Sequence, residues 1–135
     1  MRAWQVSELG NPIDVLKLCD VEQIDNPASG HVQVSIKAVG ISFPDVLQCR
    51  GEYQIKPQLP WTPGGESAGV VTKIGKGVTD ISPGDRVMML GGGLIEHVNV
   101  RSTGLWRIPD NFPFEKAAAV PVNYGTTWFL SLIHI

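Results

Sequence analysis

Glycine and proline recur along this chain and separate one short apolar run from the next. The 135 residues include 15 Gly and 10 Pro, with neither the three-residue period of collagen nor the polar clustering of a disordered linker. Because these two residues are typical of turns, their placement between apolar runs favours many short strands over long helices. We therefore expect a single, mainly β domain, which a chain of this length can form.

The clearest strand is predicted over residues 32–39, where the sequence reads VQVSIKAV. Its apolar residues alternate with Gln33, Ser35 and Lys37, and a period of two is typical of a strand with one buried face. Turn residues adjoin three further apolar runs that we also predict to be strands: 68–74, 86–90 and 94–100. Shorter strands are expected at 2–6 and 15–21.

Helices are predicted to be few and short. Ser42 is expected to be the N-cap of the first helix, with Pro44 and Asp45 in its first turn. Gly51 is expected to end that helix. Two more are expected near the carboxyl end, over residues 116–119 and 123–132. Many short strands with a few short helices indicate a partly open β-barrel.

The composition argues against several classes of partner. The formal net charge is −2 and both signs of charge are mixed along the chain, so no basic stripe is available for nucleic acid. No apolar run approaches the ~20 residues of a membrane-spanning helix, and the first residues lack the features of a signal peptide. Cys19 and Cys49 are too few for a disulfide framework. We expect a cytoplasmic protein that binds neither nucleic acid nor membranes.

Four short motifs succeed one another along the chain. They are Gly40-Ile41, Pro63-Gly64-Gly65-Glu66 before the strand at 68–74, Gly84-Asp85-Arg86-Val87, and Ala117-Ala118-Ala119 through Gly125-Thr126-Thr127. Each alone is a weak signal, because turns of this kind shape many barrels. In this order, they resemble the catalytic domain of the medium-chain dehydrogenase/reductase superfamily over residues 1–129. Within the superfamily, they resemble the zinc-independent quinone oxidoreductase group most.

The resemblance implies a GroES-like fold and an NADPH-dependent oxidoreductase. Such an enzyme reduces a small-molecule substrate, a quinone or an enone or carbonyl compound, by direct hydride transfer from NADPH. The resemblance also implies that the full-length protein is a homodimer.

Zinc is not expected in this chain. In zinc-using members of the superfamily, a Cys follows the Gly-Ile pair and a His precedes the Glu of the second motif. Those positions hold Ser42 and Gly65 here. A serine hydroxyl is a poor zinc ligand and glycine has no side chain, so two of the three expected ligands are missing. Cys49, His31 and His97 match no ligand position of the superfamily.

Reduction places negative charge on the substrate oxygen, which needs a hydrogen-bond donor or a proton source. The resemblance makes Ser42 the first candidate catalytic residue, which would also contact the cofactor. The alternative is that Ser42 only caps the helix. Tyr53, just beyond the helix, is the second candidate, and its alternative is an exposed loop residue. Glu66 is expected to be structural and to pair with a basic group beneath the site.

Two further residues are candidates for cofactor contact. The resemblance places a Thr two residues after the glycine of the last motif, where it hydrogen-bonds the nicotinamide carboxamide, and Thr127 fits this spacing. Asn123 lies just before that motif and is expected to line the same cleft. The alternative for Thr127 is an ordinary threonine early in a helix.

The fingerprint G-x-G-x-x-G, which holds the pyrophosphate of a dinucleotide between a strand and a helix, is absent. Gly91-Gly92-Gly93 lies between two predicted strands and opens no helix, so it is no substitute. We therefore expect a GroES-like substrate domain over 1–129, cut off before a Rossmann domain and inactive alone, with weak or no NADPH binding. Residues 130–135 are expected to be a non-native or frayed tail.

A free-standing GroES-like module that binds other proteins is the alternative function. Exposed apolar residues over 128–135 would then form its docking surface. The gene beyond Ile135 distinguishes the two functions. An open frame that leads to G-x-G-x-x-G supports the enzyme, and a stop codon supports the module.

Overall fold

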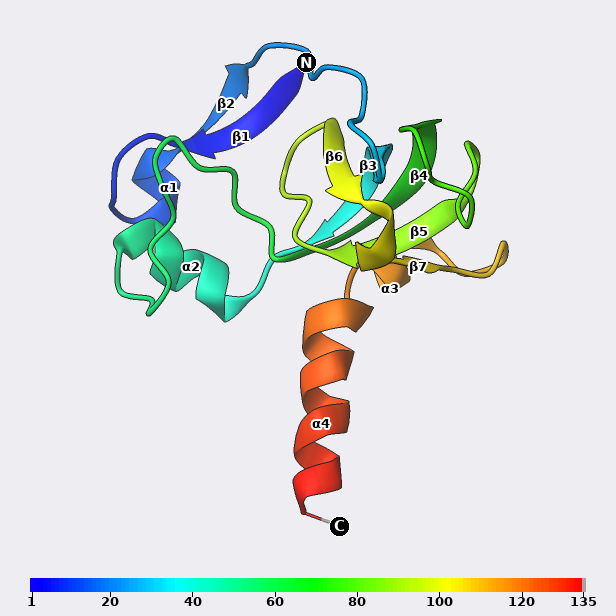
Figure 1. Cartoon of the computed structure of the whole chain (residues 1–135). Coiled ribbons are helices and arrows are strands. Elements are labelled where there is room, and N and C mark those ends of the chain that lie inside the picture. The colour runs from blue at the N-terminus through cyan, green and yellow to red at the C-terminus, as the bar shows by residue number, and fades with distance from the viewer. Residues whose placement is uncertain (135) are drawn as a thin grey trace.

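The computed structural model describes residues 1–134, which form two antiparallel sheets and a few short helices (Figure 1). The smaller sheet pairs β1 (Arg2–Val6) with β2 (Leu16–Asp20). The larger sheet has the order β6-β3-β4-β5-β7, with the bounds β3 (His31–Gly40), β4 (Glu66–Ile74), β5 (Arg86–Leu90), β6 (His97–Arg101) and β7 (Leu105–Arg107). Neither sheet closes on itself, so the prediction of a mainly β, partly open barrel is confirmed.

The strand bounds agree with the sequence for β1 and β5 and differ for β6. This strand begins at His97, three residues later than the predicted start at position 94. The residues before it contact β1 instead: the carbonyl oxygen of Leu94 accepts the Trp4 N–H at 2.8 Å. The three-residue strand β7 was not predicted, because so short a run shows no periodicity.

Strand β3 buries Val32 and Val34 completely, as the alternation predicts, but it also buries Gln33. The segment between β2 and β3 covers this side chain, whose Nε2 donates to the carbonyl oxygen of Asp25 at 3.4 Å. On the other side, the Thr72 hydroxyl donates to the Gln33 Oε1 at 3.3 Å. The prediction of a solvent-facing polar side is therefore wrong at Gln33, which is buried because both ends of its amide find partners.

The apolar core has three parts. The largest is formed by β3, β4, β5 and the connection between β4 and β5, and contains Val32, Val34, Val71, Val78, Ile81, Val87 and Met89. A second part, of Ala68, Ile108, Ala117 and Ala118, packs the carboxyl-terminal segment against the sheet. The third part, of Val6, Val15 and Cys49, joins the two-stranded sheet to helices α1 (Pro12–Val15) and α2 (Phe43–Arg50).

Helix α2 has the predicted ends. Ser42 is its N-cap and Gly51 its C-cap, with a φ of 72° in the left-handed region that glycine adopts at low cost. The two helices near the carboxyl end are α3 (Phe114–Ala117) and α4 (Gly125–Ile133). They overlap the predicted ranges 116–119 and 123–132, but α3 starts two residues earlier than predicted and α4 two residues later. A π-helical turn over Val120–Tyr124 joins them.

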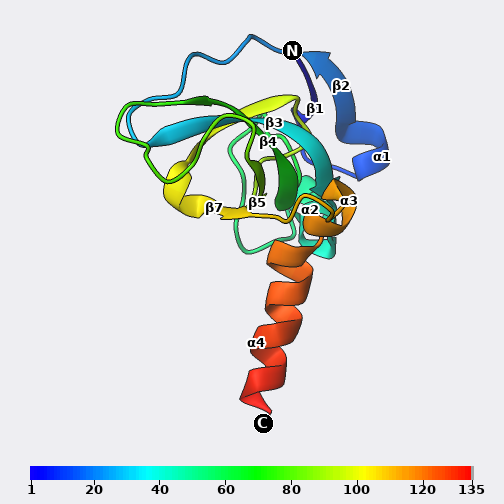
Figure 2. The same cartoon turned by 90° about the vertical axis from the view of Figure 1, so that its right-hand side faces the viewer.

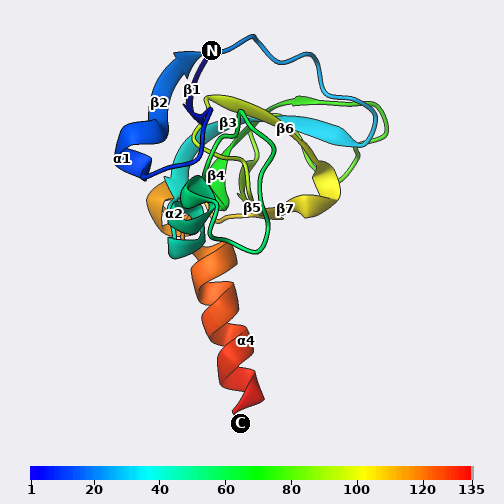
Figure 3. The ribbon, with the colours of Figure 1, turned by 90° about the vertical axis from the view of Figure 1, so that its left-hand side faces the viewer.

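Helix α4 projects away from both sheets as an isolated rod (Figures 1, 2 and 3). None of its residues is buried, and Trp128 and Phe129 are 69% and 64% exposed. Residues 130–133, expected as part of a non-native or frayed tail, continue this helix with exposed apolar side chains. Ile135 lies outside the described residues, and the domain boundary at 129 stays a prediction. Among residues 1–134, no helix has both the length and the apolar character to cross a membrane.

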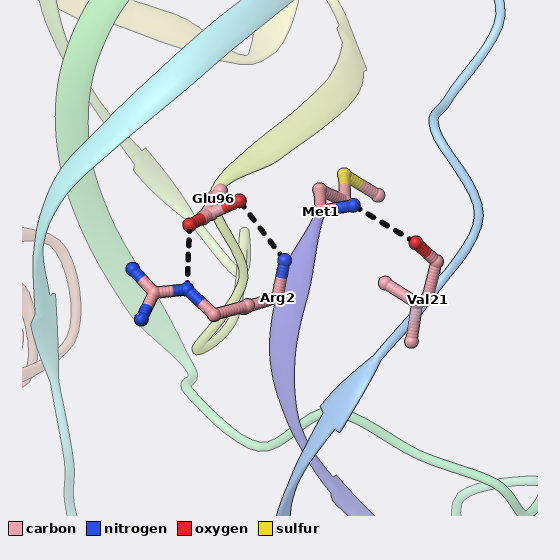
Figure 4. A network of polar contacts seen from close by, with 4 residues as sticks. All are labelled: Met1, Arg2, Val21 and Glu96. Atoms are coloured by element: carbon pink, nitrogen blue, oxygen red, sulfur yellow. Dashed lines mark hydrogen bonds and ion pairs between the residues drawn. The ribbon is translucent and has the colours of Figure 1, made fainter.

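A polar network joins the amino terminus to the residue just before β6 and to the residue just after β2 (Figure 4). The Glu96 carboxylate accepts the backbone N–H of Arg2 at 2.9 Å and the Arg2 Nε–H at 3.1 Å. The Met1 ammonium donates to the carbonyl oxygen of Val21 at 3.0 Å. The hydrogen bonds from Arg2, first that of its backbone and then that of its side chain, lower the pKa of the Glu96 carboxyl.

Candidate functional site

The candidate site lies where β3 ends and β4 begins. In this sheet, Gly40 pairs with Glu66, and Glu66 in turn pairs with Leu90 of β5. Helix α2 starts three residues after Gly40, and a run of three glycines comes after Leu90. The register therefore brings the first and second of the four sequence motifs to one end of the sheet. The segment of the last motif reaches the same end, because Val122 and Asn123 hydrogen-bond Glu66.

Asp45 organises this end of the sheet. Its side chain is 4% exposed, and its Oδ1 accepts the Gly64 backbone N–H at 2.9 Å. Its Oδ2 accepts the backbone N–H of Ser42 at 2.9 Å and the Ser42 hydroxyl at 3.1 Å. One carboxylate thus joins the start of α2 to the Pro63-Gly64-Gly65 turn. The sequence pattern placed Asp45 only in the first turn of α2, although the spacing Ser-x-x-Asp was a signal for a capping interaction.

Ser42 is half-buried, and its hydroxyl donates a hydrogen bond to the Asp45 carboxylate. A hydroxyl carries one proton and two lone pairs, so in this state Ser42 can still accept a hydrogen bond. To donate one, the hydroxyl must rotate away from Asp45. The carboxylate would then keep its two backbone partners, Ser42 N–H and Gly64 N–H.

Glu66 is fully buried, and its partners differ from the expected ones. Its Oε2 accepts the backbone N–H of Val122 at 2.7 Å, and its Oε1 accepts the Asn123 side-chain amide at 2.7 Å. The expectation of a basic partner is therefore wrong: neutral N–H groups of the π-helical turn satisfy the carboxylate. Gly40 allows this arrangement, because a Cβ at that position would lie 2.5 Å from the Glu66 Cγ.

Two of the three cofactor candidates, Asn123 and Thr127, lie next to each other at the base of α4. Both are exposed, and the Thr127 hydroxyl donates to the carbonyl oxygen of Asn123 at 2.9 Å. The Asn123 amide nitrogen is held by Glu66, which leaves its Oδ1 and the Thr127 lone pairs as polar groups for a ligand. Glu66 pairs with Gly40, so Asn123 reaches the same end of the sheet as Ser42.

Tyr53 is separate from the other candidates. It lies beyond the end of α2 opposite to Ser42, and an eight-residue helix is about 12 Å long. Tyr53 is half-buried in the loop that leads away from the helix. Ser42 and Asn123 therefore lie at the same end of the sheet, where β3 ends and β4 begins, and Thr127 lies beside Asn123. Tyr53 lies at the opposite end of α2. The catalytic and cofactor roles of all four stay predictions.

A hollow of about 340 Å³ lies beside Asp45. We call it the glycine hollow, after the five glycines among its lining residues: Asp45, Gln48, Trp61, Thr62, Gly64, Gly65, Gly91, Gly92 and Gly93. Cys49 of α2 is 2% exposed, and burial, more than the nearby Asp45 charge, raises the pKa of its thiol. A protonated, buried thiol is a poor nucleophile.

Metal-binding side chains do not gather at this end of the sheet. Within the described residues, no three His, Cys, Asp or Glu side chains lie close enough together to hold a metal ion. That the protein works without zinc stays a prediction from the residues at positions 42 and 65.

A family profile and a related sequence both match this chain. The profile of the alcohol dehydrogenase GroES-like domain matches residues 28–110. A quinone oxidoreductase-like protein 2 homolog from Nematostella vectensis is 41% identical over 130 residues, which are 94% of this chain and 35% of that protein.

Solved structures agree in fold. A probable oxidoreductase from Mycobacterium abscessus superposes with a TM-score of 0.89 and 38% identity, over 98% of this chain and 42% of the other. The Escherichia coli quinone oxidoreductase complexed with NADPH has a TM-score of 0.86 and 33% identity, over 96% of this chain and 40% of the other. The chain therefore spans about 35–42% of the length of these proteins.

Proposed function

Because this chain belongs to the alcohol dehydrogenase GroES-like domain family, within the medium-chain dehydrogenases/reductases, we propose that it is the substrate-side domain of an NADPH-dependent oxidoreductase. The enzyme reduces quinones, or enone or carbonyl compounds, without zinc. The domain covers residues 1–129, and the dinucleotide is held mainly by a second domain. Alone, the 135 residues are inactive.

One observation carries this proposal: the buried carboxylate that holds the Ser42 hydroxyl, Asp45, also lines a glycine-rich hollow, at the same end of the sheet as Asn123. A hydroxyl donor one hydrogen bond away from the wall of such a hollow suits the reduction of a carbonyl oxygen. Support also comes from relatives named quinone oxidoreductase-like, and from an Escherichia coli quinone oxidoreductase whose structure contains NADPH.

Each candidate residue of this chain would then have its own role. NADPH supplies the hydride when it is bound. Thr127 and Asn123 hold the nicotinamide end at the base of α4. The Ser42 hydroxyl rotates from Asp45 to donate to the substrate oxygen as that oxygen gains charge, and Asp45 keeps its backbone partners. Tyr53 is a second donor from the far end of α2. The full-length protein is a cytoplasmic homodimer.

A variant series tests these roles in the chain extended by the downstream reading frame of its gene. The assay is NADPH oxidation with duroquinone, whose fully substituted ring does not add thiols. Ser42→Ala is expected to lower kcat/KM about 100-fold, the effect of removing one donor from a developing oxyanion, and Tyr53→Phe less. Thr103→Ala, which removes an exposed hydroxyl on the 3-10 helical turn Ser102–Gly104, is the control and is expected to change nothing. Full kcat/KM in both site variants would disprove the proposed donors.

A protein-binding module is the second candidate function. The exposed side chains of α4, among them Trp128 and Phe129, are the observation that favours it. A stop codon directly after Ile135, with no nucleotide-binding sequence in frame, would support the module and contradict the enzyme.

A further inference from the structure

The backbone conformation requires glycine at some of the five glycine positions of the glycine hollow, but not at all of them. Four of them have a positive φ, in which other residues are strained: Gly64 at 123°, Gly91 at 74°, Gly92 at 92° and Gly93 at 75°. Gly65 has no such conformation. A Cβ at Gly65 would meet only the Asp45 Oδ2, at 4.0 Å, which is an ordinary contact distance.

Neither the backbone nor the packing therefore requires glycine at position 65. Glycine loses more conformational entropy on folding than any other residue, so a glycine without a structural reason costs stability. What the missing side chain leaves behind is space in the hollow. A Cβ and further atoms at Gly65 would enter that space, because little else lies in their way.

The walls of the hollow favour a flat, neutral ligand. A carboxylate can accept about four hydrogen bonds, and Asp45 already accepts three. Asp45 therefore does not need a cationic ligand as a partner. The Trp61 ring and the backbone of the glycines are planar surfaces, and an indole stacks well on another ring. The volume of about 340 Å³ lies at the small end of ligand pockets, which suits one ring and its substituents.

We propose that the glycine hollow receives the ring of the substrate, and that Gly65 determines how large this ring can be. The inference rests on the proposed function for the identity of the ligand, a quinone. It adds a specificity-determining residue to that function. The hollow borders Asp45, which bonds the Ser42 hydroxyl, so a ring in the hollow places its carbonyl oxygen near that donor.

The test compares two quinones of different size in the extended chain. Duroquinone has one ring and 2,3-dimethyl-1,4-naphthoquinone has two, and neither has an open quinone position for thiols. Gly65→Ala is expected to lower kcat/KM for the two-ring compound about tenfold more than for duroquinone, since one methyl group in a pocket discriminates by this order. Gly65→Val is expected to lower both. Gly104→Ala is the control, because a Cβ there meets nothing and Gly104 has no positive φ.

A binding measurement on the 135-residue chain separates this inference from the proposed function. Duroquinone is expected to shift the amide resonances of Gly65, Gly91 and Gly92, and Gly65→Val is expected to abolish these shifts in a chain that stays folded. Binding of this kind without NADPH oxidation by the extended chain would contradict the proposed function alone. An unchanged ratio of the two kcat/KM values in Gly65→Ala, with turnover intact, would overturn the role of Gly65. Shifts confined to the hollow beside Trp106 and Trp128 would overturn it as well.

Discussion

At the scale of single residues, two buried carboxylates, Asp45 and Glu66, hold the candidate site together. Each accepts hydrogen bonds from segments that are distant in sequence, and neither has a cation among its hydrogen-bond partners. Buried carboxylates of this kind are stable because several N–H or O–H groups replace their hydration. Their partners fix the position of Ser42 on one side and of Asn123 on the other.

Replacement of Glu66 tests this arrangement. Glu66→Ala would leave the half-buried Val122 N–H without a partner, and we expect it to lower the free energy of unfolding by about 1–3 kcal/mol. Glu66→Gln is expected to cost much less. Its carbonyl oxygen can accept from Val122, and its amide can donate to Asn123 once the Asn123 carboxamide has rotated by half a turn. Urea unfolding of both variants measures the difference, and equal losses would contradict the account.

The Glu96 carboxylate makes stability depend on pH. The hydrogen bonds from Arg2 lower the pKa of Glu96 in the folded chain, so its contribution is present above the ordinary Glu pKa of about 4.3. This contribution is lost as the pH falls through the lower folded pKa. We expect Glu96→Gln to flatten the decline of Tm between about pH 5 and pH 3. A Tm profile parallel to that of the parent chain would show that the network in Figure 4 does not contribute.

The sequence anticipated local features of the site better than distant ones. Ser42 and Gly51 were assigned correctly as the ends of α2, because capping preferences depend on neighbours in sequence. The partners of Glu66 were not predicted, because Val122 and Asn123 lie 56 and 57 positions away along the chain. Contacts of this range depend on the register of β3, β4 and the π-helical turn.

At the scale of elements, the limits of sequence patterns are visible in β6, β7 and the π-helical turn. A strand of three residues shows no period, and an apolar run such as Leu94–Ile95 can contact a different strand from the one it precedes. Strands β1 and β5 were both assigned with their observed bounds. For β5 the reason is local, because a turn over residues 82–85 precedes it and Gly91 follows it.

Helix α4 is the element with the weakest support. It has nine residues and none of them is buried, and an isolated helix of this length is marginal in water. In the 135-residue chain, we expect the amide hydrogens of residues 128–133 to exchange without measurable protection, while those of β3 and β4 stay protected. Hydrogen exchange measured by NMR checks this, and protection of α4 equal to that of the sheet would contradict it.

At the scale of the whole molecule, we propose that the chain provides one wall of a reaction site. It spans about 35–42% of the length of the proteins it matches, and the exposed side chains of α4 face away from its own core. We propose that this wall supports hydride transfer without a metal ion, and that it does so only when a second domain holds the cofactor.

The decisive experiment measures NADPH oxidation side by side on the extended chain and on the 135 residues alone, with and without a strong zinc chelator. We expect steady turnover of duroquinone by the extended chain at the same rate in both conditions, and none by the 135 residues. A loss of activity on chelation that added zinc restores, or sustained turnover by the short chain, would contradict the account.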